Sequence, residues 1–266
     1  MRIIVAVAFV ICYCSCAVKP ASIEGRKVAT SPQLFTDRFD NVYILKVNGE
    51  LDMYNANREL LFTYANNSLG NVSHVDVTNP QNIVAFVQDF NTIAVLDNTL
   101  AELTTIDLAS LEYPEITMAA TSNDGNYWIY DQANWRLVKI DRVGNEINQS
   151  NRLTDYNLAQ FTPVYMLERD NKVYISTSTE QLLIFDNFGQ FIKSIPMPGL
   201  TKFSYEAGRI YYLSEGDVVS YDLKYLTVAQ EAIEEVEHEQ LVDMVKIKHG
   251  FMFLTDSGNY IKRMDH

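Results

Sequence analysis

The stretch from Asp170 to Gln190 reads DNKVYISTSTEQLLIFDNFGQ and contains one example of the pattern that decides the fold. The polar pair Asp170-Asn171 precedes an apolar strand at Val173–Ser176. A short turn then leads to a second apolar strand, which ends at Asp186. Polar turns that bracket short runs of β-branched and aromatic residues are typical of antiparallel hairpins.

The same unit recurs six times along the chain. Its first strand is predicted at Val42–Leu45, Ile83–Phe86, Tyr127–Tyr130, Val173–Ser176, Ile210–Leu213 and Phe251–Leu254. The second strands end at Asn55, Asp97, Asp141, Asp186, Asp222 and Asp265, so successive units are 42, 44, 45, 36 and 43 residues apart. This period, without helical patterns between the units, predicts an all-β, six-bladed β-propeller with four antiparallel strands per blade.

The two ends of the repeat predict how the ring closes. The sixth unit reaches Asp265 without sequence for an outer strand, whereas the first unit is preceded by a spare segment, Glu24–Ser31. Because an exposed sheet edge invites further pairing, we expect this segment to lie beside Tyr260–Met264 and to complete the last blade. Residues 24–266 are therefore expected to form a single propeller domain.

Two turn segments resemble a known family. These segments, Ile140-Asp141-Arg142-Val143-Gly144-Asn145 and Phe185-Asp186-Asn187-Phe188-Gly189-Gln190, are similar to the blade turns of NHL-type and related six-bladed propellers. The resemblance extends over nearly all of residues 24–266. It implies the fold and no particular activity, because blade motifs recur in propellers of many functions.

Residues 1–16 predict an export signal. Arg2 precedes a short apolar run, Ile3–Tyr13, and all three cysteines of the chain lie at positions 12, 14 and 16. Ser15-Cys16 resembles the loose lipobox of Bacteroidota lipoproteins, which implies that Cys16 carries lipid and that residues 17–23 are a tether. No acidic cluster follows Cys16, which favours the periplasmic face of the outer membrane. An ordinary cleaved signal is the alternative.

Charge and residue usage argue against several classes of function. A net charge of −13 disfavours binding to nucleic acid or to anionic lipid surfaces. The four histidines are not spaced as metal ligands and no cysteine follows Cys16, so neither a metal site nor a cofactor is expected. No catalytic-serine, zinc-peptidase or phosphate-binding motif occurs. We therefore expect a protein that is not an enzyme.

The two tryptophans receive different predictions. Trp128 occupies a strand position that is apolar in all six units and is expected in the core between blades. Trp135 lies in a turn, Phe90 occupies the corresponding loop of the preceding unit, and Tyr156 and Phe161 lie in the next link between units. We expect these four aromatic side chains to be exposed on one face and to bind a partner.

These features predict a membrane-tethered scaffold that binds protein partners. By analogy with small propeller lipoproteins, including those of the type IX secretion apparatus, we expect an accessory subunit of an outer-membrane protein export or assembly complex. Two alternatives stay open. One is a calcium-dependent propeller hydrolase or lactonase that uses the central channel, and the other is a carbohydrate or peptide sensor that uses the aromatic face.

Overall fold

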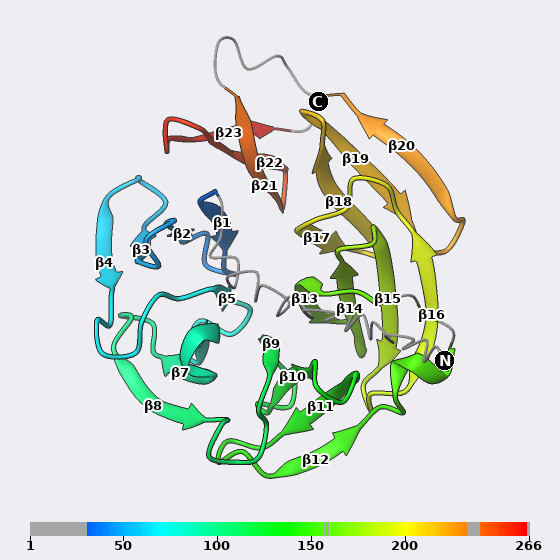
Figure 1. The fold of residues 1–266 in the computed structure, drawn as a ribbon. Helices are drawn as coiled ribbons and strands as arrows, with labels where there is room; N and C mark the ends of the chain where they lie inside the picture. Colours follow the sequence, from blue (N-terminus) through cyan, green and yellow to red (C-terminus); the bar gives the residue numbers. More distant parts are fainter. Residues whose placement is uncertain (1–30, 157, 159, 233–239, 265–266) are drawn as a thin grey trace, which may run out of the picture.

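The computed structural model describes residues 31–156, 158, 160–232 and 240–264. They form six antiparallel sheets that follow one another around a central axis, with the first strand of each sheet innermost (Figure 1). The prediction of an all-β, six-bladed propeller is confirmed.

Each blade is a simple meander of consecutive strands. The first three blades consist of β1 (Gln33–Thr36), β2 (Val42–Leu45), β3 (Leu51–Tyr54) and β4 (Leu60–Tyr64); β5 (His74–Asp76), β6 (Ile83–Val87), β7 (Thr92–Leu96) and β8 (Glu102–Asp107); and β9 (Ile116–Thr121), β10 (Tyr127–Asp131), β11 (Arg136–Ile140) and β12 (Glu146–Gln149). The other three consist of β13 (Pro163–Arg169), β14 (Lys172–Thr177), β15 (Gln181–Asp186) and β16 (Phe191–Pro196); β17 (Phe203–Glu206), β18 (Arg209–Ser214), β19 (Asp217–Asp222) and β20 (Thr227–Glu231); and β21 (Leu241–Ile247), β22 (Gly250–Thr255) and β23 (Tyr260–Met264). Two short 3₁₀ helices, η1 (Gln88–Phe90) and η2 (Leu153–Tyr156), lie in the connections. The strands recognised in the repeat are thus the second and third of each blade.

The meander gives the ring two distinct faces. One face, the link face, carries the connections between blades and the turns from second to third strands. The opposite face, the turn face, carries the turns from first to second and from third to fourth strands. Since each inner strand runs from the link face to the turn face, the C-terminal ends of the inner strands gather around the axis at the turn face.

The acidic residues that end the third strands are structural, as expected. Asp186 accepts hydrogen bonds at Oδ1 from the backbone N–H groups of Phe188 (2.9 Å) and Gln190 (2.8 Å). Asp141 binds the N–H groups of Val143 and Asn145 in the same way. These carboxylates fix the turn to the outer strand, because they satisfy N–H groups that no strand partner reaches.

The core lies between the blades. The strand position of Trp128 is buried in every blade, with Tyr43, Val84, Tyr174, Tyr211 and Met252 as its equivalents. Trp128 itself is fully buried, and its indole N–H donates to Glu168 Oε2 of the next blade. The expected core role of Trp128 is confirmed.

The ring closes at its inner strands. The last blade adjoins the first (Figure 1), and the backbone N–H of Leu34 on β1 donates to Asp243 Oδ2 on β21 over 2.7 Å. In the part of the chain that the structure describes, the last sheet has three strands. The closing strand expected at Glu24–Ser31 falls on residues 24–30, which lie outside the described residues, so its pairing with β23 stays a prediction.

Candidate functional site

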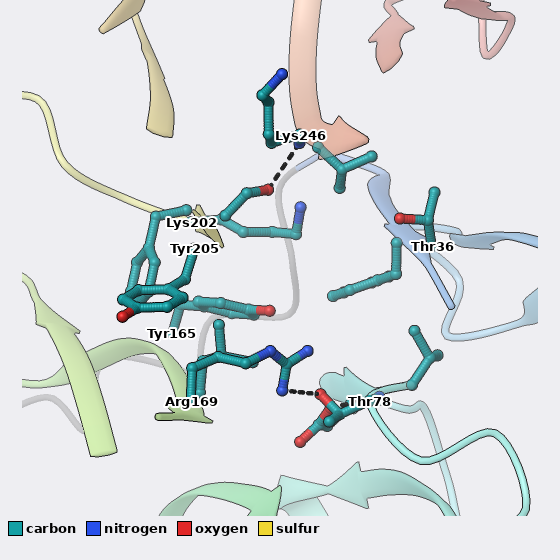
Figure 2. Close-up of a pocket in the computed structure, with 14 residues that line it drawn as sticks. Thr36, Thr78, Tyr165, Arg169, Lys202, Tyr205 and Lys246 are labelled. Atoms are coloured by element: carbon teal, nitrogen blue, oxygen red, sulfur yellow. Dashed lines mark hydrogen bonds between the residues drawn. The ribbon is translucent and has the colours of Figure 1, made fainter. Parts of the chain in front are cut away.

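The ends of the inner strands enclose a small cavity in the central channel. Its walls come from β1, β5, β13, β17 and β21, which reach the turn face around the axis (Figure 2). The cavity has a volume of about 100 Å³ and is lined by charged, hydroxyl-bearing and aromatic side chains. Because the C-terminal ends of these strands contribute to its lining, it lies toward the turn face, opposite to the loops in which the sequence predicted a binding surface.

Lys202 and Asp243 form a buried ion pair at the cavity wall. The Lys202 ammonium lies 3.0 Å from Asp243 Oδ2 and donates to the Met244 carbonyl over 3.3 Å. It also lies 4.9 Å from the centre of the Phe35 ring. Burial lowers the pKa of Lys202, and Asp243 opposes that shift. The pair joins the fifth blade to the sixth, and Asp243 also accepts the backbone N–H of Leu34 in the first blade.

Arg169 lies at the end of β13 and extends into the cavity (Figure 2). One terminal nitrogen, Nη1, donates to Thr78 Oγ1 over 3.1 Å and to the Glu168 carbonyl over 2.9 Å. Both acceptors are neutral oxygens. Within residues 31–156, 158, 160–232 and 240–264, no carboxylate lies within 4.0 Å of this guanidinium. Arg169 is therefore a half-buried cation without an anionic neighbour among the described residues.

Tyr165 of the cavity lining packs edge to face against His74, with ring centres 5.4 Å apart. Burial raises the pKa of Tyr165, and the charge of Asp76 adds to this shift. Burial lowers the pKa of His74 to about 4, so this imidazole is neutral at pH 7. His74 Nε2 is buried and has no hydrogen-bond partner among the described residues.

Two further buried carboxylates of the inner strands, Asp76 and Glu168, connect neighbouring blades. Asp76 accepts the backbone N–H of Thr78 at Oδ1 and that of Thr121, in the next blade, at Oδ2, both over 2.8 Å. Glu168 binds the Trp128 indole and the Ser122 hydroxyl, the latter over 2.7 Å. These acids satisfy polar groups of adjacent inner strands, and each therefore has a structural task.

The structure corrects one of the predicted exposed aromatic residues. Phe161 is only 5% exposed, and its ring packs against Tyr130 and Trp135 with centres 5.6 Å away in both cases. A link between blades needs an apolar anchor to cover the end of the core, and Phe161 serves that purpose. The sequence could not distinguish this anchor from an exposed aromatic residue, because the neighbouring residues are polar in both cases.

The other predicted partner-binding residues lie on the link face, as expected. Phe90, at the end of η1, is 55% exposed. Trp135 is half-buried against Phe161, and Tyr156 is half-buried against Phe191, with ring centres 4.7 Å apart. Phe161 belongs to the core cluster between the third and fourth blades, and Trp135 and Tyr156 pack against that cluster. Cys16 lies outside the described residues. The role of Phe90, Trp135 and Tyr156 in partner binding stays a prediction.

Sequence reasoning missed the cavity residues. Lys202 and Arg169 lie next to turns, where a charged residue suggests solvent exposure. A weak signal was present, because Tyr165, Leu167 and Arg169 alternate along β13 and share the side that faces the channel. The alternation does not reveal which side of an inner strand faces the axis.

Neither a cluster of metal ligands nor a membrane-spanning helix occurs among the described residues. No group of three or more His, Cys, Asp and Glu side chains is arranged to hold a metal ion there. No helix in the same ranges combines the length and the apolar character that a membrane span requires.

No model of a known protein family matches this chain, and no curated protein matches it. Several solved structures share its fold. They include a catalytically inactive variant of virginiamycin B lyase from Staphylococcus aureus with quinupristin (TM-score 0.62, 10% identity, covering 87% of this chain and 94% of that chain). The Pan2 WD40 domain of Neurospora crassa (0.59, 9%, 88% and 75%) and a protein of unknown function from Bacteroides caccae (0.55, 12%, 82% and 90%) are also similar. At these identities the likeness establishes the propeller fold alone.

Proposed function

We propose that this chain is a non-catalytic scaffold that binds protein partners through the turn face of its propeller. The supporting observation is a row of apolar side chains on the turn face. Val143, Phe188 and Tyr225 occupy the turns from third to fourth strands of three consecutive blades, and they are 70%, 60% and 66% exposed. We call these three residues the turn-tip row.

The turn-tip row has the properties of a protein-binding surface. Its members are held at fixed spacing because each turn is braced by the preceding aspartate, as Asp141 and Asp186 show. A rigid surface loses little conformational entropy when a partner binds, and exposed aromatic residues supply most of the binding energy in typical interfaces. The buried acids of the channel, by contrast, are engaged in contacts between blades.

The expected setting is the periplasmic face of an outer membrane. Lipidation at Cys16 would tether the ring there, and the scaffold would be an accessory subunit of a protein export or assembly complex, such as the type IX secretion apparatus. Replacing Cys16 by alanine should release the protein from membranes and abolish labelling by a fatty-acid probe. Unchanged membrane fractionation together with unlabelled wild type would contradict the tether.

Affinity capture from solubilised native membranes tests the scaffold role. Wild type should recover a defined set of outer-membrane proteins, and the V143S/F188S/Y225S variant should lose them, with a weakening of about 2 kcal/mol or more. The matched control, L103S/I147S/I192S, removes three exposed aliphatic side chains from the outer strands and should capture the same set as wild type. Equal recovery by both triple variants would overturn the proposal.

The hydrolase alternative is tested by calcium. If a calcium ion in the channel supported catalysis, a chelator would lower the melting temperature by many degrees, because the ion would stabilise the folded state. We expect the melting temperature to be nearly unchanged and lactonase and esterase activity to be lacking in the purified domain.

A further inference from the structure

We propose that the cavity at the turn-face end of the channel binds a small organic monocarboxylate, whose carboxylate pairs with Arg169. This inference is independent of the scaffold role, because it concerns the axis of the ring and not the turn-tip row. It rests on the charges around the cavity, on the direction of its donors and on its size.

Among the described residues, the charges around the cavity leave one cation for a ligand. Lys202 is neutralised by Asp243 at 3.0 Å, and Lys246 has Glu206 at 3.9 Å. Within the described ranges, Arg169 donates to neutral oxygens of Thr78 and Glu168 and has no carboxylate partner. A half-buried guanidinium without a counter-charge is costly, so one added negative charge at this point is favourable.

Asp76, the carboxylate in the cavity lining, does not take this place. Its two oxygens each accept a backbone N–H, from Thr78 and Thr121. No ion pair between Asp76 and Arg169 occurs within 4.0 Å. The charge of Asp76 does, however, disfavour a ligand with two negative charges, and this selects a monoanion.

The donors of the cavity point toward one space. Figure 2 shows the Arg169 guanidinium, the Tyr165 hydroxyl and the Lys202 ammonium all directed into the channel, with the Thr36 hydroxyl opposite to them. The Lys246 side chain is directed away. Because Nη1 of Arg169 carries both of its hydrogen bonds to protein, Nε and Nη2 are available for the fork-shaped contact that guanidinium makes with carboxylate.

The walls and the volume define the rest of the ligand. Phe35, Leu167 and Val245 contribute apolar surface beside the donors. A cavity of about 100 Å³ accommodates only a few heavy atoms besides the carboxylate. Short aliphatic acids therefore fit better than sugars, nucleotides or peptides.

Calorimetric titration of the purified protein with sodium butyrate tests the proposal. Butyramide, the neutral analogue of the same size, serves as the ligand control, and sodium chloride controls for ionic strength. We expect saturable binding of butyrate that is at least 10-fold tighter than that of butyramide, and no saturable heat from chloride. Equal binding of acid and amide, or no saturable binding of butyrate, would overturn the proposal.

Variants locate the site. Arg169→Gln should weaken butyrate binding 10- to 100-fold, the scale of hydrogen bonds to charged groups. Arg142→Gln, which changes an arginine at a turn tip, should bind as wild type does. If Arg169→Gln does not fold, Tyr165→Phe removes one hydroxyl from the same cavity and should weaken binding at least 3-fold. Wild-type affinity in a folded cavity variant would refute the site.

Discussion

Replacing Trp128 by phenylalanine isolates the contribution of one buried hydrogen bond to the contact between the third and fourth blades. The indole is fully buried, and its N–H donates to Glu168, a carboxylate that is only 2% exposed. In the variant, Glu168 keeps the Ser122 hydroxyl as a donor and loses the indole. A hydrogen bond to a buried charge contributes about 1.5–3 kcal/mol, and the smaller ring leaves a cavity that costs about 1 kcal/mol more.

We therefore expect Trp128→Phe to lower the free energy of unfolding by about 2.5–4 kcal/mol. Trp128→Ala should cost more, since the cavity term alone is about 3–5 kcal/mol. Urea unfolding followed by far-UV circular dichroism measures both values, provided that the dependence of the free energy on urea concentration stays the same. Trp135→Ala is the matched control, because its half-buried ring should contribute less to stability.

A double variant distinguishes the hydrogen bond from the packing. Trp128→Phe combined with Glu168→Gln replaces the under-solvated carboxylate by a neutral amide, so it should recover more than about 1 kcal/mol of the loss. If the single and double variants are equally stable, the charge of Glu168 does not cause the loss. A loss below about 1 kcal/mol in Trp128→Phe would refute the argument as a whole.

Two other predictions follow from buried groups and from backbone geometry. The folded state lowers the pKa of His74 to about 4. The unfolded state therefore takes up a proton between about pH 6.5 and pH 4 that the folded state does not take up. As the pH is lowered through this window, the free energy of unfolding should fall by up to about 3 kcal/mol. His74→Gln should flatten this dependence in pH-dependent urea unfolding, while the exposed His249→Gln should not, and an unchanged slope in His74→Gln would contradict the assignment. Gly49→Ala should destabilise the protein by about 1–3 kcal/mol more than Gly216→Ala does. Both glycines have positive φ, but only the new Cβ at Gly49 would lie 2.6 Å from a backbone atom, the Cα of Asn71. Equal melting temperatures of the two variants would show that the backbone near Asn71 moves aside without loss of stability.

The sequence alone determined the number of blades, the second and third strands of each blade and the core position of Trp128. These features depend on neighbours along the chain. Alternation of apolar residues identifies the strands, and an acidic residue followed by a tight turn marks the end of each third strand, as Asp186 does. Because these turn and strand preferences act between neighbours along the chain, the hairpins can be predicted from the sequence.

Only the tertiary structure decided which face carries a cavity and which side chains line it. Tyr165, Arg169 and Lys202 come from different blades or from different levels of one strand, and they converge only because the ring brings their strands to a common axis. The burial of Phe161 was decided in the same way, since Tyr130 of β10 and Trp135 of the turn from β10 to β11 pack against it from the preceding blade. The residues that surround an inner strand come from blades that lie tens of residues away in the sequence. Local sequence patterns therefore do not predict which side chains these neighbours contribute.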